Sequence, residues 1–325
     1  MEVEESMSQK LLLERITPER LLDLFIEDCR DRQLTEETIR RYRSSIKQFL
    51  DYLHQRGTSP TQVDKHTLHD YIRERRQQKV GQKTLENDLT GIAGFYEYLV
   101  FEDHMERNPV PGVRKRYLRR YKEENDGDVE SPRRLLTIEQ MSLLINSVID
   151  TRDKAIMTLL AKTGVRRGEL IAMDIDDVNW TEQSITLKRS QFKKRSGRTV
   201  FFDDETARLL KRWLNHREHL KLENTALFTG EHEERLKRNG VYSMIAKYAE
   251  PVGLHNPKSL NPEDHFSAHC FRHWFTTHLR RAGMDREFIK ALRGDRRREA
   301  IDIYDHIDSE ELRRAYLAFI PQLGV

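Results

Sequence analysis

Apolar residues recur at helical spacing through the first hundred residues. Thr17 and Pro18 read as an N-cap with proline at the first helical position, and the apolar residues that follow share one face. A second stripe begins at Thr35 and ends near Gly57, a third includes Leu68, and a fourth follows Gly81. These stripes predict four helices, whose apolar residues include Leu21, Phe25 and Ile26, then Ile39, Ile46 and Phe49, then Leu68, Tyr71 and Ile72, then Leu89, Ile92 and Phe95.

Beyond residue 134 the pattern changes to helical stripes with short alternating runs between them. The alternating runs are Val178–Trp180, Ser184–Lys188 and Arg198–Phe202, and their length fits a small antiparallel sheet. Helices are expected at Thr137–Ser147, Arg152–Lys162, Ala207–His216, Gly240–Glu250, His269–Ala282, Phe288–Leu292 and Glu310–Ile320. The fold class expected is mainly α with a small antiparallel β-sheet, and the second domain is α+β.

A linker is expected between the two patterns. Residues 109–134 mix proline, glycine, basic and acidic residues without apolar periodicity. We therefore expect a tail at 1–14, a helical domain at 15–108, a linker at 109–134 and a second domain at 135–325.

Composition excludes some classes of protein. No stretch of the 325 residues approaches the roughly 18 apolar residues of a membrane span, so we expect no membrane partner. The acidic first twenty residues do not resemble a secretory signal, and two cysteines are too few for a disulfide scaffold. We expect a cytoplasmic protein.

Positive charge is concentrated in the expected linker. The formal net charge is only +3, yet the segment 114–122 carries six basic residues and no acidic one. Such a cluster favours a nucleic-acid partner, with phosphate contacts from Arg114, Lys115, Arg116, Arg119, Arg120 and Lys122.

Four strings in the second domain carry candidate chemistry: TGVRRGEL at 163–170, FKKRSGR at 192–198, HCFRHWF at 269–275 and RGDRRREAIDIY at 293–304. Each alone is typical of a solvated helix face. Their order and spacing resemble the tyrosine recombinase (phage integrase, Xer-like) family, with Tyr304 ten residues past Gly294. The resemblance implies a tyrosine recombinase catalytic domain, and the helical region looks like the family's SAM-like core-binding domain.

The residue types suit metal-independent cleavage of a phosphodiester. Tyr304 would attack the scissile phosphate and form a 3′-phosphotyrosine that stores the bond energy, so neither ATP nor another cofactor is expected. Arg166 and Arg272 would each offer a planar fork of donors to the non-bridging oxygens.

Three further residues complete the expected site. Lys193 would protonate the leaving oxygen, although Lys194 and Lys188 are close alternatives in the hairpin. His269 would assist proton transfer or hold the phosphate, and Glu169 matches the family's acidic residue that orients Arg166.

Asp295 departs from the family pattern, which usually has histidine or tryptophan there as a phosphate donor. An ionised carboxylate would repel the phosphate unless it were paired, and the adjacent run Arg296, Arg297 and Arg298 could pair it.

Three alternatives compete with the recombinase. A metal nuclease would use Asp174, Asp176 and Asp177, but these residues follow a turn pattern that favours aspartate, and no metal-ligand spacing is present. A non-catalytic DNA-binding protein leaves the ordered series of strings unexplained. A type IB topoisomerase shares the chemistry and differs in assembly and site preference.

The resemblance also implies double-stranded DNA as the partner and a synaptic tetramer on two DNA sites. The last helix carries an apolar stripe that can pack in two places. It packs on its own domain, or it docks into a neighbouring protomer as the family's C-terminal segments do; of these we favour the second.

Overall fold

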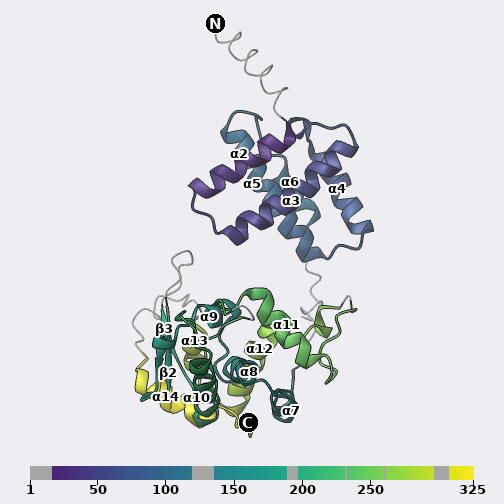
Figure 1. Ribbon diagram of the computed structural model, residues 1–325. Coiled ribbons are helices and arrows are strands. Elements are labelled where there is room, and N and C mark those ends of the chain that lie inside the picture. The colour runs from purple at the N-terminus through teal and green to yellow at the C-terminus, as the bar shows by residue number, and fades with distance from the viewer. Residues whose placement is uncertain (1–16, 119–134, 189–196, 231–232, 260, 296–306) are drawn as a thin grey trace. The chain divides into compact units, whose positions relative to one another are not determined.

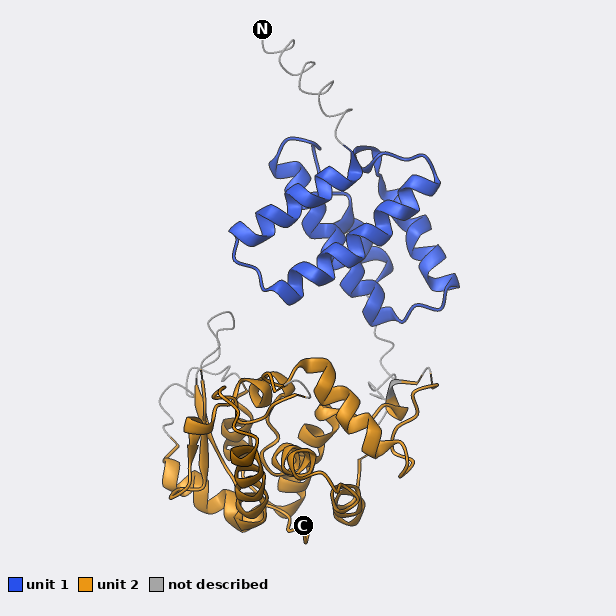
Figure 2. Ribbon diagram, viewed as in Figure 1, with its two compact units in different colours: residues 1–127 blue, residues 128–325 orange. Residues whose placement is uncertain are grey.

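The structure is a computed structural model that describes residues 17–118, 135–188, 197–230, 233–259, 261–295 and 307–325. The chain divides into two compact units, Met1–Gly127 and Asp128–Val325, each described here by itself (Figure 2). In the described part of the chain, no helix is both long enough and apolar enough to cross a membrane.

The first unit is all helical, as predicted. Thr17 accepts a hydrogen bond from the backbone N–H of Arg20 and so caps the first helix. The apolar stripes form one core around Phe25, Phe49 and Phe95, each fully buried. The helices are α2 (Pro18–Asp31), α3 (Glu36–Gln55), α4 (Lys65–Gln77), α5 (Gln82–Phe101) and α6 (Val110–Tyr117), with a 3₁₀ turn at Pro60–Gln62.

Helix α6 lies where the sequence predicts the start of the linker. Asn108 fixes its start, because its side chain donates to the carbonyl of Ala93 and accepts from the N–H of Val110. Val110 and Val113 are buried against the core of the first unit. Two apolar residues in eight are too few to show a helical period, and so the sequence did not reveal the helix.

The second unit combines helices with one small sheet (Figure 1). The sheet is antiparallel in the order β1-β2-β3, with Ile185 opposite both Val178 and Val200, which confirms the predicted sheet. The strands are β1 (Val178–Asn179), β2 (Ser184–Leu187) and β3 (Arg198–Phe201). The helices are α7 (Ile138–Asn146), α8 (Thr151–Thr163), α9 (Arg167–Ala172), α10 (Asp204–His219), α11 (Arg238–Ala249), α12 (Ala268–Ala282), α13 (Arg286–Arg293) and α14 (Ser309–Phe319), with 3₁₀ turns at Ile175–Asp177 and Pro262–Asp264.

Helix α8 is the centre of this unit and packs against α10 and α12, while α13 packs on β3. Lys162 near its end is fully buried, and its ammonium group lies 2.5 Å from carboxylate oxygens of both Asp203 and Glu205. A buried lysine is tolerated because these carboxylates compensate its charge.

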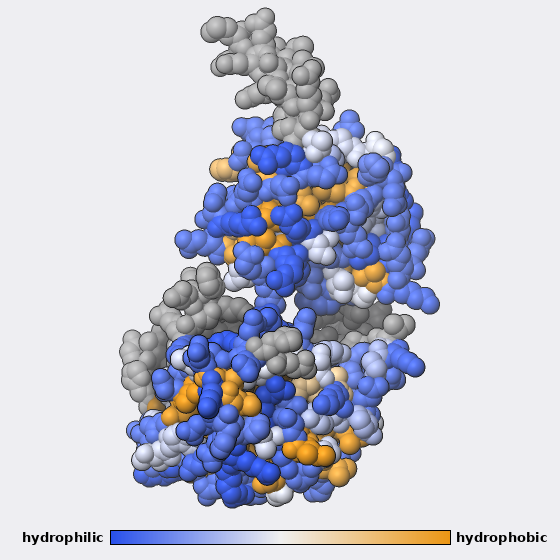
Figure 3. Space-filling view, in the orientation of Figure 1, coloured by the Kyte–Doolittle hydropathy of each residue, from blue (hydrophilic) through white to orange (hydrophobic). Residues whose placement is uncertain are grey.

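On the face in Figure 3, apolar residues form small patches within a hydrophilic surface.

The C-terminal segment packs on its own unit in this chain. The Tyr316 hydroxyl donates to the carbonyl of Lys162, and Lys162 also donates to the carbonyl of Pro321. Glu205 accepts backbone N–H groups from Leu323 and Gly324. The sequence left two packing sites open for this segment, its own domain or a neighbouring protomer. In the single chain it packs on its own domain.

Candidate active site

Four of the predicted site residues converge in the second unit: Arg166, Glu169, Arg272 and Asp295. His269 is exposed on the first turn of α12 and lines the same pocket as the two arginines. Lys193 and Tyr304 lie outside the described residues, as do Arg119, Arg120 and Lys122 of the predicted DNA contacts. Of the remaining basic residues, Lys115 and Arg116 are exposed, and Arg114 donates to the hydroxyl of Thr90.

A tight turn between α8 and α9 places Arg166. Gly164 ends α8 with a φ of +57°, and a Cβ there would lie 2.4 Å from the ring of Phe275, so only glycine fits. Arg166 is then the N-cap of α9, and its backbone N–H and its guanidinium both donate to Glu169. The T-G-V string is therefore a turn that aims one arginine.

Arg272 projects from the second turn of α12 and is almost fully buried. Its guanidinium donates to the carbonyl of Gly164 at 2.7 Å and to that of Arg293 at 2.8 Å. Burial, and then the charges of Arg166 and Arg293, lower the pKa of Arg272 to about 9, so the group is still a cation at neutral pH.

The C-terminal end of α13 holds both arginines. The carbonyl of Arg293 accepts from Arg166 at 3.1 Å as well as from Arg272. Carbonyls in the last turn of a helix have no partner within the helix and carry the negative end of its dipole, which suits two cations. The site therefore depends on α9 and on the consecutive helices α12 and α13, which lie far from α9 in sequence.

Arg198 is a residue of the site that the sequence analysis did not select. It begins β3 and makes two parallel hydrogen bonds to Glu169, of 2.9 and 3.0 Å, and a third to the carbonyl of Leu292. A Cβ on Gly294 would lie 2.7 Å from its guanidinium. One signal in the sequence could have identified Arg198: it is a charged residue at the start of a predicted strand whose last residues are apolar.

Glu169 is held as an anion by these arginines. Burial alone would raise its pKa, but hydrogen bonds and charge from Arg198, and then from Arg166, outweigh burial and lower the pKa to about 2. A carboxylate so engaged fixes the arginines and is not available as a proton acceptor at neutral pH.

Replacing Glu169 with glutamine tests this arrangement. Because the folded-state pKa is depressed, the charge contributes stability above the unfolded-state value near 4.5, and this contribution is lost as pH falls toward 2. We expect Glu169→Gln to lower the free energy of unfolding at pH 7 by about 3 kcal/mol, with the deficit shrinking below pH 4.5. Urea unfolding across pH measures it. The partly exposed Glu287→Gln is the control, and a deficit that does not change with pH would contradict the assignment.

Asp295 has three ion-pair partners among the described residues. Its Oδ1 atom lies 3.3 Å from Nη2 of Arg166 and 3.2 Å from Nη2 of Arg272. Its Oδ2 atom lies 3.1 Å from Nε of Arg293, without hydrogen-bond geometry. The predicted partners, Arg296, Arg297 and Arg298, lie outside the described residues.

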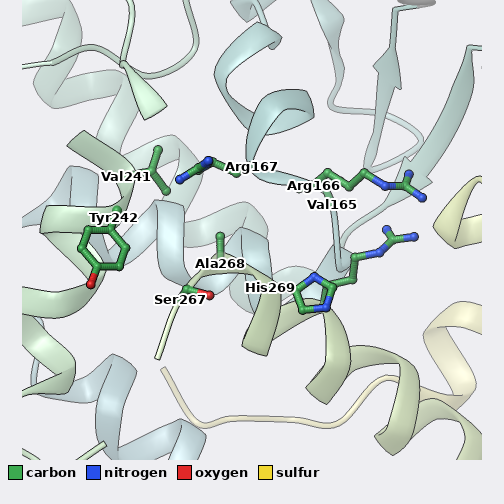
Figure 4. A pocket seen from close by; sticks show the side chains of 9 residues that line it. Val165, Arg166, Arg167, Val241, Tyr242, Ser267, Ala268 and His269 are labelled. Atoms are coloured by element: carbon green, nitrogen blue, oxygen red, sulfur yellow. The ribbon is translucent and has the colours of Figure 1, made fainter. Parts of the chain in front are cut away.

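A pocket of about 300 Å³ opens beside the two arginines (Figure 4). His269 and Arg166 lie toward one side of it, and Tyr242 with Val241 toward the other. Paired guanidinium groups at an open pocket can bind a phosphate bidentately.

The aspartates of the metal-nuclease alternative have another role. Asp174 accepts from Lys188 and Arg235, and these hydrogen bonds lower its pKa to about 2, while Asp177 accepts from the N–H of Asp174. Within the described ranges, no group of three or more histidine, cysteine or acidic residues could hold a metal ion. The cluster ties the end of β2 to the turn before β1.

A mainly helical unit with two paired arginines at an open pocket is suited to binding a phosphate group. Models of two families match the chain: "Phage integrase family" over residues 134–311, and "Phage integrase, N-terminal SAM-like domain" over residues 22–103. The chain belongs to the phage integrase family, and it is a tyrosine-type site-specific DNA recombinase. This favours the recombinase over the non-catalytic and topoisomerase alternatives.

Relatives and solved structures agree in fold and extent. Tyrosine recombinase XerC of Actinobacillus pleuropneumoniae serotype 7 is 27% identical over 90% of each chain, and that of Vibrio cholerae is 26% identical over 88% and 87%. The XerH site-specific recombinase bound to difH substrate matches with a TM-score of 0.63 at 18% identity, covering 93% of this chain and 84% of that one. The Tn1549 transposon integrase in complex with transposon right end DNA matches at 0.62 and 17%, covering 90% and 97%.

Proposed function

We propose that this chain cleaves and rejoins duplex DNA through a 3′-phosphotyrosine intermediate, with Arg166 and Arg272 holding the scissile phosphate. One observation carries the proposal. The two guanidinium groups already meet on a single carboxylate oxygen, at 3.3 and 3.2 Å, which is the arrangement needed for a non-bridging phosphate oxygen.

Each of the predicted residues then has its own role in the chemical step. The Tyr304 oxygen attacks phosphorus and loses its proton, with His269 assisting, while the bond from phosphorus to the 5′-oxygen breaks. Lys193 gives a proton to the leaving 5′-oxygen. The number of phosphoester bonds is unchanged, so the reverse attack by a 5′-hydroxyl rejoins the strand without ATP.

Fixed positive charge is the main aid that this site gives to the reaction. Negative charge grows on the equatorial oxygens as the nucleophile enters, and donors that are already positioned stabilise it without reorganisation. Both guanidinium groups are fixed by the carbonyl of Arg293, and Arg272 also by that of Gly164. Preorganisation of this kind is the structural basis that we propose for catalysis.

The proposed partner is double-stranded DNA, contacted through phosphates by the basic segment from Arg114 to Lys122. Such contacts give affinity and a steep salt dependence rather than sequence choice. We also propose a cytoplasmic location. XerH and the Tn1549 integrase are described in complex with DNA, which supports the assignment.

We also propose that protomers assemble into a synaptic tetramer on two DNA sites. In the single chain, Lys162 and Glu205 bind the backbone of residues 321–324. Because these contacts are to backbone atoms, the same segment from a second copy offers the same partners. An exchange of this segment between protomers would link them without a new binding surface.

The chemistry is tested by cleavage in the presence of a chelator. Because the arginines and Lys193 supply the positive charge that a metal would otherwise supply, we expect a denaturant-resistant protein–DNA adduct on a nicked suicide duplex in EDTA. Its yield should equal that without EDTA, measured by denaturing gel electrophoresis. Loss in EDTA with recovery in magnesium would support a metal nuclease instead.

A further inference from the structure

Asp295 lies on the atoms that would bind the phosphate. One oxygen, Oδ1, contacts Nη2 of Arg166 and Nη2 of Arg272 together, at 3.3 and 3.2 Å. These are donors of the two guanidinium groups that would hold a non-bridging oxygen. The carboxylate and a phosphate oxygen therefore compete for the same place.

The side chain is not needed to end helix α13. Gly294 adopts a left-handed conformation with φ of +60°, and its N–H donates to the carbonyl of Ala291. The N–H of Asp295 donates to the carbonyl of Lys290. These backbone bonds already close the helix, so the position of the carboxylate is explained by the arginines alone.

The two carboxylates of the site differ in how firmly they are held. Glu169 accepts two hydrogen bonds from Arg198 and two from Arg166, between 2.7 and 3.1 Å. The Asp295 contacts to Arg166 and Arg272 are longer than the roughly 2.7–2.9 Å of a strong charge-assisted bond. Its side chain is 29% exposed, against 19% for Glu169. Asp295 is therefore the carboxylate that an incoming anion can displace.

Charge balance leaves room for that anion. Among the described residues, four guanidinium groups, those of Arg166, Arg198, Arg272 and Arg293, face two carboxylates, so this set holds two positive charges in excess. Like charges at this distance repel, and the lowered pKa of Arg272 reflects burial first and then this repulsion. Without Asp295 the excess would rise to three in the absence of DNA.

We propose that Asp295 is an internal counter-anion, which occupies the phosphate-oxygen position on Arg166 and Arg272 when DNA is absent and is displaced by the scissile phosphate. It keeps the two guanidinium groups aimed at one point, and it lowers the affinity of the site for free anions. Asp295 is thus a positioning residue that sets how strongly the site binds phosphate. The inference rests on the proposed roles of the two arginines.

The test measures binding of inorganic phosphate to the full chain without DNA. The thermal midpoint is followed as phosphate replaces chloride at constant ionic strength. We expect Asp295→Asn to lower the midpoint without phosphate and to bind phosphate about fivefold more tightly than the wild type, because two partly exposed ion pairs no longer compete. Asp295→Ser, which also lacks the charge, should behave in the same way and replaces Asp295→Asn if that variant does not fold.

Two controls separate competition from a general effect of charge. Glu287→Gln removes the same charge from α13, where Glu287 pairs with Lys290, and should leave phosphate affinity unchanged. The gain of Asp295→Asn should disappear when Arg272→Lys is added. Unchanged affinity in Asp295→Asn and Asp295→Ser, or a gain that persists without Arg272, overturns the proposal. Because no cleavage is measured, this outcome is distinguishable from failure of the Tyr304-dependent adduct.

Discussion

Tyr304→Phe is expected to abolish the covalent protein–DNA adduct completely. Phenylalanine keeps the ring but has no oxygen to bond to phosphorus, so the step cannot begin. The measurement is a denaturing gel of a nicked suicide duplex with radiolabel on the strand that keeps the 3′-phosphate. Binding to the uncut duplex should be unchanged, because the phosphate contacts come from other residues.

Two other tyrosines make this result specific. Tyr42→Phe in the first unit keeps the ring that stacks on Phe25 and should form the adduct at the wild-type rate. Tyr242 lines the same pocket as Arg166, and this residue is 39% exposed. If the adduct survives in Tyr304→Phe and is lost in Tyr242→Phe, the nucleophile is Tyr242 and the spacing argument from Gly294 is wrong.

The sequence predicted most of the helices and the sheet, because each of these has a face that must be buried. The stripes of the first unit and the three short strands appear in the structure at the expected places. Helix α6 has too few apolar residues to show a helical period. It is stabilised by packing against the core of the first unit, and the local sequence does not reveal this packing.

The site was predictable where a residue type is tied to a turn. Gly164, Arg166 and Glu169 form one local unit, so their string could be recognised. Arg198 could not be selected in this way, because its partners Glu169 and Leu292 are brought to it only by the fold. The contacts of Asp295 with Arg166 and Arg272 could not be predicted for the same reason, since the fold alone brings these residues together.

Arg272 is the residue whose conservative replacement should be most costly among those that the structure describes. Its guanidinium reaches the carbonyls of Gly164 and Arg293 and the carboxylate of Asp295 at once. Lysine keeps the charge but presents a single compact ammonium group, so it cannot hold two carbonyls and also bind a phosphate oxygen. We expect Arg272→Lys to slow adduct formation by about a hundredfold to a thousandfold, as for loss of one positioned donor to a developing oxyanion.

The loss in Arg272→Lys should fall on the chemical step and much less on DNA binding. Most of the affinity comes from phosphates elsewhere on the duplex, whereas Arg272 acts on the one phosphate whose charge grows in the transition state. Single-turnover rates at saturating protein, together with gel-shift affinity, separate the two effects. Arg281→Lys is the matched control, because Arg281 is exposed on the same helix and its replacement should change neither quantity. A rate for Arg272→Lys within threefold of the wild type would mean that the buried guanidinium fixes α12 and α13 together without touching the phosphate.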